Sequence, residues 1–92
     1  MNITPEHIPI LVKTLCERTG HAPTTLSRLA TGSGATFARI HANKPITFQR
    51  LERIYQFFSD NWPIDLQWPH HVPRPPPHAL PPEQKLTPRK IR

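Results

Sequence analysis

The apolar residues between positions 8 and 62 recur at three- and four-residue steps, the spacing of helices with one buried face. The first run predicts a helix from about Pro9 to Thr19, because proline suits the first helical position and Gly20 can end a helix. Its apolar face consists of Ile8, Leu11, Val12, Leu15 and Cys16. These residues predict one wall of a small hydrophobic core.

A second helix is predicted after Pro23, with Thr24 as the residue that caps its first turn. Its apolar face consists of Leu26, Leu29 and Ala30. Thr31-Gly32-Ser33-Gly34 ends this helix, because either glycine can adopt the positive φ of a turn. Ser33 is the candidate cap of the helix that follows. The register of the turn, at Gly32 or at Gly34, stays open.

The third predicted helix covers about residues 34–43 and has two different faces. Phe37 and Ile40 form its apolar face. The opposite face carries Thr36, Arg39 and Asn43, set among the small residues Ala35, Ala38 and Ala42. A small-residue surface lets a helix approach a ligand closely, and arginine and asparagine suit guanine and adenine edges in the major groove. An ordinary amphipathic helix with a solvated polar face explains the same residues equally well.

A fourth helix is predicted from Thr47, a good capping residue after the rigid Pro45. Its apolar residues cover more than one face: Phe48, Leu51, Ile54, Tyr55, Phe57 and Phe58. Such a helix either lies centrally in a bundle or also buries a partner. We therefore predict a homodimer, at least on DNA, joined through Tyr55, Phe57, Phe58, Trp62 and Trp68. The alternative is that Trp62 to Trp68 fold over this helix within one chain.

Composition divides the chain at Trp62. Nine of the 13 prolines fall in residues 63–92, which excludes regular helix and sheet interiors there and favours polyproline II or disorder. Trp62, Ile64, Leu66 and Trp68 are expected to pack on the bundle, and the chain from Pro69 onward to be extended and mobile. We predict an all-α fold: a small four-helix helix-turn-helix bundle, residues 1–62, with an extended proline-rich tail, residues 63–92.

Charge favours a polyanionic partner. Twelve Lys and Arg residues against six Asp and Glu give a net charge of +6 and a pI near 10.5. The lone Cys16 excludes an internal disulfide and a cysteine metal cluster, and it is expected in the core of a cytoplasmic protein. The six histidines do not have the spacing of a zinc site. No feature favours an enzyme, a cofactor, secretion or membrane insertion.

One segment resembles a known family. Leu29-Ala30, the turn glycine, Arg39-Ile40 and Lys44-Pro45-Ile46-Thr47, followed by Leu51 and Ile54, are similar to the lambda-repressor-like helix-turn-helix family of Cro and phage-repressor type. In particular, the segment resembles small prophage-encoded bacterial regulators. The resemblance covers roughly Leu11 to Trp62. The chain departs from the family pattern at Asn43, where the family often has glycine, although asparagine tolerates the left-handed conformation.

The resemblance implies a transcriptional regulator, repressor or activator, that binds a specific double-stranded DNA sequence. The residues expected to read bases are Thr36, Arg39 and Asn43. The residues expected to contact phosphates are Thr24, Thr25, Arg28, Lys44, Thr47 and Arg50. The alternative is a protein-interaction module of the same fold that binds RNA polymerase or another regulator through the fourth helix and the tail. Within that tail, Arg74-Pro75-Pro76-Pro77 is either a stiff spacer or a ligand for an aromatic groove.

Overall fold

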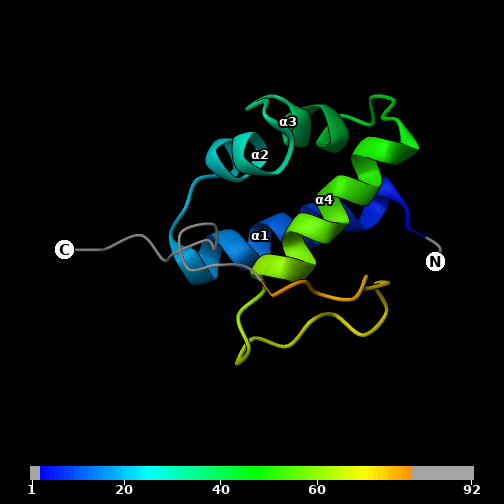
Figure 1. Cartoon of the computed structure of the whole chain (residues 1–92). Helices are drawn as coiled ribbons and strands as arrows, with labels where there is room; N and C mark the ends of the chain where they lie inside the picture. Colours follow the sequence, from blue (N-terminus) through cyan, green and yellow to red (C-terminus); the bar gives the residue numbers. More distant parts are fainter. Residues whose placement is uncertain (1–2, 80–92) are drawn as a thin grey trace.

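The structure, a computed structural model, describes residues 3–79. A 3₁₀ turn, η1 (Pro5–His7), precedes four α-helices: α1 (Ile8–Thr19), α2 (Pro23–Thr31), α3 (Thr36–His41) and α4 (Phe48–Asn61). Residues 3–79 contain no strand. The predicted all-α fold with four helices is therefore confirmed (Figure 1). Residues 80–92 of the predicted tail lie outside the described part of the chain.

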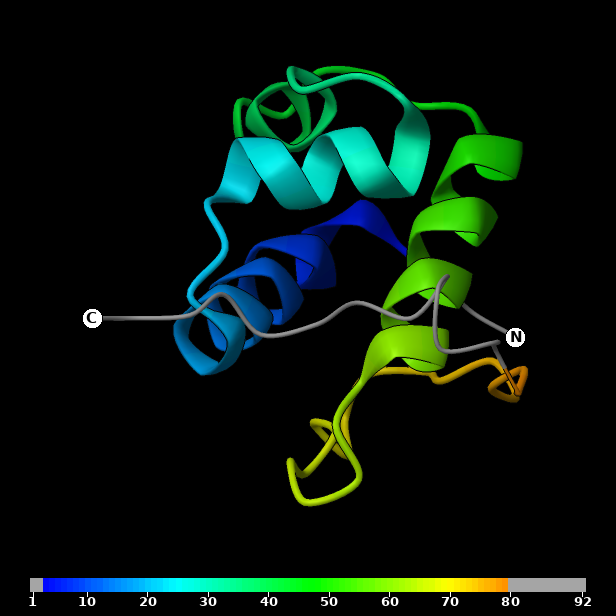
Figure 2. The same cartoon turned by 60° about the vertical axis from the view of Figure 1, so that its left-hand side comes forward.

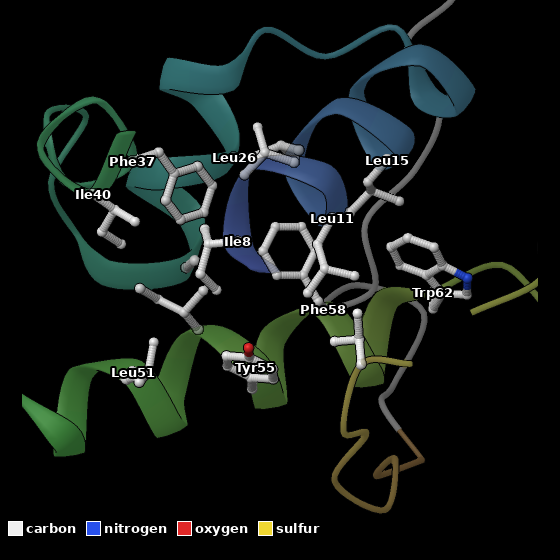
Figure 3. Close-up of a cluster of buried hydrophobic side chains, with 14 residues drawn as sticks. Ile8, Leu11, Leu15, Leu26, Phe37, Ile40, Leu51, Tyr55, Phe58 and Trp62 are labelled. Carbon is white, nitrogen blue, oxygen red and sulfur yellow. The ribbon is translucent and has the colours of Figure 1, made fainter. Parts of the chain in front are cut away.

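The short helices α2 and α3 lie together on one side of the molecule, above α1 and beside the start of α4 (Figures 1 and 2). α2 packs against each of the other three helices. Side chains from all four helices point into the space between them (Figure 3). The fully buried apolar side chains there are Ile8, Leu11, Leu15, Leu26, Ile54, Tyr55 and Phe58. The core thus sits between α4 and the other three helices.

Local chemistry sets most of the helix ends. Gly20 and Gly32 both adopt the left-handed conformation, with φ of 78° and 83°, and end α1 and α2 as predicted. Gly34 does not have positive φ, so the register of the turn is fixed at Gly32. The predicted cap Thr47 is confirmed, because its hydroxyl accepts the N–H of Arg50 at 3.2 Å.

Two other predicted caps are wrong. α2 begins one residue before Thr24, with Pro23 at its first position and the extended residue Ala22 as its cap. Proline already supplies a helical φ there, and Thr24 makes no capping bond. Ala35, rather than Ser33, precedes α3, although the Ser33 hydroxyl does accept the N–H of Ala35 at 3.3 Å.

The predicted inner face of α2 is also partly wrong. Leu29 is 55% exposed, and the buried residues are Leu26, Ser27 and Ala30. Ser27 is buried because its hydroxyl donates to the Ser33 carbonyl at 2.6 Å and accepts the N–H of Phe37 at 3.1 Å. These hydrogen bonds satisfy a polar group inside the molecule, so α2 can turn this residue inward and leave Leu29 outside.

The segment after α4 packs back on the helix bundle. Trp62 and Val72 are buried with the core, and Leu66 and Trp68 are partly buried against it. The Trp62 and Trp68 rings meet with centroids 4.9 Å apart. Each indole N–H donates to a backbone carbonyl, that of Leu66 for the first ring and that of Val72 for the second. Ile64 departs from the prediction, since its side chain is fully exposed.

The chain beyond Pro69 was expected to be extended and mobile, but hydrogen bonds join it to α4 as far as His78. Arg74 makes two of these hydrogen bonds. Its guanidinium donates to the hydroxyl of Ser59 at 3.1 Å and to the carbonyl of the same residue at 3.0 Å. The same group lies 5.1 Å from the centre of the Trp68 ring, a cation–π contact. We call residues 74–78 and their partners on α4 the tail clasp.

Asp60 holds the far end of the tail clasp. Its carboxylate accepts the side-chain amide of Gln56 and the backbone N–H of His78, both at 2.7 Å. Partial burial alone would raise the pKa of this carboxyl, but these hydrogen bonds outweigh that effect and lower the pKa below its usual 3.8. The ionised form of Asp60 is therefore the form that holds the tail.

Ile40 is a core residue of α3 and should be expensive to truncate. We expect Ile40→Ala to lower the free energy of unfolding by about 2–5 kcal/mol, because most of a buried apolar side chain is removed and a cavity is left. Leu29→Ala, at an exposed position of α2, should change the free energy of unfolding by no more than about 0.5 kcal/mol. Chemical unfolding measures both, and equal effects of the two changes would contradict this assignment of faces.

The tail clasp should lose its contribution to the free energy of unfolding at acid pH. Because the folded-state pKa of Asp60 is depressed, its contribution is complete above the unfolded-state pKa and is lost as pH falls through the folded-state pKa. Asp60→Asn should therefore destabilise the protein by about 1 kcal/mol at pH 7. The difference between variant and wild type should shrink steadily below about pH 4. Unfolding titrations of both proteins from pH 7 to pH 2.5 test this, and a pH-independent difference would refute it.

Candidate nucleic-acid interface

The turn between α2 and α3 is fixed by side-chain hydrogen bonds. Besides the two bonds of Ser27, the Thr31 hydroxyl donates to the Ser27 carbonyl at 2.8 Å and lies 3.0 Å from the Thr36 hydroxyl. The Gly32 N–H donates to the carbonyl of Arg28. These bonds hold the start of α3 against the end of α2, so the direction of α3 relative to α2 is set before any ligand is present.

α3 is shorter than predicted. It covers six residues, Thr36–His41, whereas residues 34–43 were expected. Gly34 and Ala35 belong to the turn, and Asn43 has φ of 60°, which ends the helix. The Asn43 N–H donates to the carbonyl of Ile40, and the next N–H, that of Lys44, donates to the carbonyl of Arg39. Asn43 therefore closes α3 in the left-handed conformation.

The apolar face of α3 is as predicted. Phe37 and Ile40 are both buried, and the Phe37 ring stacks on that of Phe58 with centroids 5.8 Å apart. The opposite face of the helix and its C-terminal end are exposed: Ala38, Arg39, His41, Ala42 and Asn43. The helix is therefore anchored through one face and presents a polar face with small neighbours to solvent.

The structure brings two of the three predicted base-reading residues to the surface. Arg39 and Asn43 are exposed and four residues apart at the end of α3. Thr36 is only 6% exposed, and its hydroxyl is engaged with that of Thr31. Thr36 is thus placed to hold the start of α3 rather than to meet a base.

The predicted phosphate-contacting residues fall into two groups. Thr24, Thr25 and Arg28 lie on α2, where only Thr25 is half-buried. Lys44, Thr47 and Arg50 are exposed on the loop after α3 and the first turn of α4. The view in Figure 1 places α3 between α2 and that loop. The two groups therefore flank the exposed end of α3.

A small polar pocket of about 120 Å³ lies between α3 and the start of α4. Arg39, Thr47 and Arg50 line it, together with Ser33 and Thr36. No acidic residue lines this pocket. Within residues 3–79, no ion pair or side-chain hydrogen bond engages the guanidinium of Arg39 or of Arg50. Two cations thus face the same small space beside the first turn of a helix, whose free N–H groups also favour an anion.

Two other basic side chains, those of Arg18 and Arg74, are engaged inside the chain. Arg18 donates to both carboxylate oxygens of Asp65, at 2.9 and 2.6 Å. This pairing raises the pKa of Arg18 and lowers the pKa of Asp65, through the hydrogen bond first and the charge second. Arg74 serves the tail clasp. The side chains of Arg28, Arg39, Lys44 and Arg50 make no such contact within the described residues.

No group of three or more His, Cys, Asp or Glu side chains in residues 3–79 could hold a metal ion. Cys16 packs at the edge of the core and lines a mainly apolar groove of about 690 Å³ between α1 and the α2–α3 pair. Burial raises the pKa of its thiol and so disfavours the reactive thiolate. In the same part of the chain, no helix has the length and apolar character needed to cross a membrane.

Sequence reasoning missed the residues that fix the turn. Ser27 and Thr31 were overlooked because each sits at a helical position where a hydroxyl residue is usually solvated. The available signal was the run of hydroxyl residues around the glycines, namely Ser27, Thr31, Ser33 and Thr36.

In comparisons with known proteins, no family model, no curated protein and no solved structure matches this chain. The resemblance to the lambda-repressor-like family therefore stays a prediction made from the residues themselves. The candidate interface, which we define as α3 with the exposed basic residues beside it, is described by its geometry alone.

The left-handed conformation of Asn43 can be tested through the stability of the protein. We expect Asn43→Gly to keep the free energy of unfolding within about 0.5 kcal/mol, because glycine adopts positive φ without strain. Asn43→Val should lower it by about 1–2 kcal/mol, because a β-branched side chain disfavours that conformation. Thermal unfolding measures both variants. Equal stability of the two would show that the αL position does not end α3.

Proposed function

We propose that this protein is a transcriptional regulator that binds a specific double-stranded DNA sequence, with α3 lying in the major groove. The observation that carries the proposal is the group of exposed, internally unpaired cations around α3: Arg28, Arg39, Lys44 and Arg50. The backbone of DNA is a regular array of negative charges, and such a group attracts it. The buried face of α3 holds the helix in one orientation, which base reading requires.

Arg39 and Asn43 are the residues proposed to read bases. Arginine can donate two hydrogen bonds to O6 and N7 of a guanine, and asparagine can pair with N6 and N7 of an adenine. Ala38 and Ala42 are exposed beside them and leave room for close approach. The sequence analysis grouped Thr36 with these base-reading residues, but in this proposal Thr36 does not contact a base. Its buried hydroxyl fixes the turn instead.

The flanking residues are proposed to set the register of the protein on DNA. Thr24 and Arg28 would contact phosphates from α2, and Lys44, Thr47 and Arg50 from the opposite end of α3. The pocket lined by Arg39 and Arg50 suits a phosphate oxygen as well. Arg39 therefore has two possible DNA partners, a base edge and a phosphate, which the experiment below distinguishes.

The alternative function, a protein-interaction module that binds RNA polymerase or another regulator, would use α4 and the tail. Its support is weaker, because Tyr55, Phe58 and Trp62 are buried in their own chain. The guanidinium of Arg74, the cation of the proline-rich motif, already contacts Ser59 and Trp68. The described tail thus presents few unused groups to a partner.

The role of Arg39 can be tested once a binding sequence has been selected from a random duplex pool. We expect Arg39→Ala to weaken binding to that sequence by about 1–3 kcal/mol and to relax the preference at one base pair. Lys44→Ala should weaken all sequences to a similar extent and lower the salt dependence by about one phosphate contact. Binding titrations at several salt concentrations measure both effects.

Arg39→Lys is the matched control for this experiment, because lysine keeps the charge but cannot donate the paired hydrogen bonds of a guanidinium. If Arg39 reads a base, the lysine variant loses base preference and keeps general affinity. If Arg39 only contacts a phosphate, the lysine variant behaves like wild type. Failure of the selection to yield any preferred sequence would refute the proposed sequence-specific function.

A further inference from the structure

The apolar surface that the sequence analysis assigned to a homodimer is covered within one chain. Tyr55, Phe58 and Trp62 are buried. Phe57 and Trp68 are partly buried against the core, because the segment after α4 folds back on the bundle. The alternative stated with that prediction accounts for these residues. An apolar surface that the described part of the chain leaves open lies elsewhere, in the groove between α1 and the α2–α3 pair.

One stripe of α1 forms a wall of this groove, which has a volume of about 690 Å³. Its residues recur at three- and four-residue steps, the spacing of one helix face: Val12, Lys13, Cys16 and Glu17. On the other side, α3 contributes Phe37 and His41. We call this feature the α1–α3 groove.

The floor of the α1–α3 groove is apolar and held in place. Val12 and Phe37 are only 8% and 6% exposed, and the Phe37 ring stacks on that of Phe58. Sites for small molecules are typically concave, about 300–1,000 Å³ in volume, and lined by apolar groups with a few polar groups among them. The α1–α3 groove has this size and this lining, and its floor suits a flat apolar group such as an aromatic ring.

Two opposite charges lie one helical turn apart on the α1 wall. Lys13 and Glu17 both line the groove, and residues at this spacing on a helix have their Cβ atoms about 5–6 Å apart. Within residues 3–79, no ion pair or side-chain hydrogen bond engages either group. A ligand that carries a carboxylate and an ammonium on neighbouring atoms is complementary to this pair, because each of its charges meets the opposite charge on α1. Charge therefore indicates a zwitterionic head group.

We propose that the α1–α3 groove binds a free aromatic α-amino acid. Its ring packs on Val12 and Phe37, its carboxylate meets Lys13, and its ammonium meets Glu17. The inference does not rest on DNA binding, and it can be tested without DNA.

The proposed ligand site is largely separate from the proposed DNA contacts. The base-reading residues Arg39 and Asn43 do not line the α1–α3 groove, whereas Thr24, one of the residues proposed to contact phosphates, does. Because α3 forms one wall, a bound amino acid would link a metabolite to the helix that is proposed to read DNA.

The test is an NMR titration of the isotopically labelled full chain with L-tryptophan, up to millimolar concentration. We expect saturable shifts of the amide signals of Val12, Lys13 and Phe37. L-Alanine, which lacks the ring, should bind at least about tenfold more weakly, because the apolar floor then stays uncovered. Tryptamine lacks the carboxylate and indole-3-propionate lacks the ammonium. Each should bind at least about threefold more weakly than L-tryptophan, the effect of losing one exposed charge pair.

Charge variants connect the head group of the ligand to α1. Lys13→Gln should weaken the binding of L-tryptophan and indole-3-propionate but not that of tryptamine. Glu17→Gln should weaken the binding of L-tryptophan and tryptamine but not that of indole-3-propionate. The matched controls are Arg53→Gln and Glu52→Gln, which remove exposed charges of α4 that do not line the groove. They should leave the binding of all three compounds unchanged.

Three results would overturn the proposal. The first is the absence of saturable shifts at the groove with L-tryptophan. The second is binding of L-tryptophan that Lys13→Gln and Glu17→Gln do not weaken, although circular dichroism shows both variants folded. The third is binding of tryptamine or indole-3-propionate as tight as that of L-tryptophan, which would exclude recognition of a zwitterion. Each result leaves the proposed DNA-binding function untouched, since no DNA is present in the experiment.

Discussion

The contact on which the structure depends most is the burial of Phe58. This ring is fully buried near the end of α4, and the rings of Phe37, Phe57 and Trp62 all pack around it. The Trp62 ring in turn meets that of Trp68, which carries the guanidinium of Arg74. A continuous series of aromatic contacts therefore joins α3, α4 and the segment after α4 into one core. A chain this small has few other ways to bury enough apolar surface.

The position of α3 follows from this constraint. A helix of six residues is far too short to be stable alone, so its geometry must come from its packing. Phe37 fixes it to Phe58, and the hydrogen bonds of Ser27 and Thr36 fix its first turn. What remains free is the exposed side with Arg39 and the residue that closes the helix, Asn43. A binding surface needs polar groups exposed to solvent on an element whose other face is held rigidly by packing, and α3 has both.

Local chemistry explains what the sequence could predict. Gly20, Gly32 and Thr47 act within one helical turn of themselves, so the helix ends that depend on them could be read from neighbouring residues. The same holds for Phe37 and Ile40, whose spacing defines the inner face of α3. The inward turn of Ser27 could not be read in this way. It depends on a carbonyl six residues away, and the helical period alone favours Leu29 at the buried position.

Long-range contacts explain the rest of what was missed. The attachment of the tail depends on Arg74 reaching Ser59, fifteen residues earlier, and on Asp60 accepting the N–H of His78. A proline-rich composition indicates an extended backbone, but it carries no information about which helix that backbone lies against. The exposure of Phe48 was missed for the opposite reason. An aromatic residue at the start of an apolar run is assigned to the core, although Phe48, in the first turn of α4, is 58% exposed.

The distribution of charge shows why net charge is a poor guide to a binding surface. By sequence the excess of +6 is shared equally between residues 1–62 and 63–92, with seven bases and four acids in the first part and five bases and two acids in the second. The structure uses Arg18 to hold Asp65, and Arg74 to hold Ser59 and Trp68. The cations that stay unpaired within the described residues include the four around α3. Attraction to a polyanion is screened over about 8 Å in physiological salt, so the local group of cations determines the attraction, and the total charge of the chain does not.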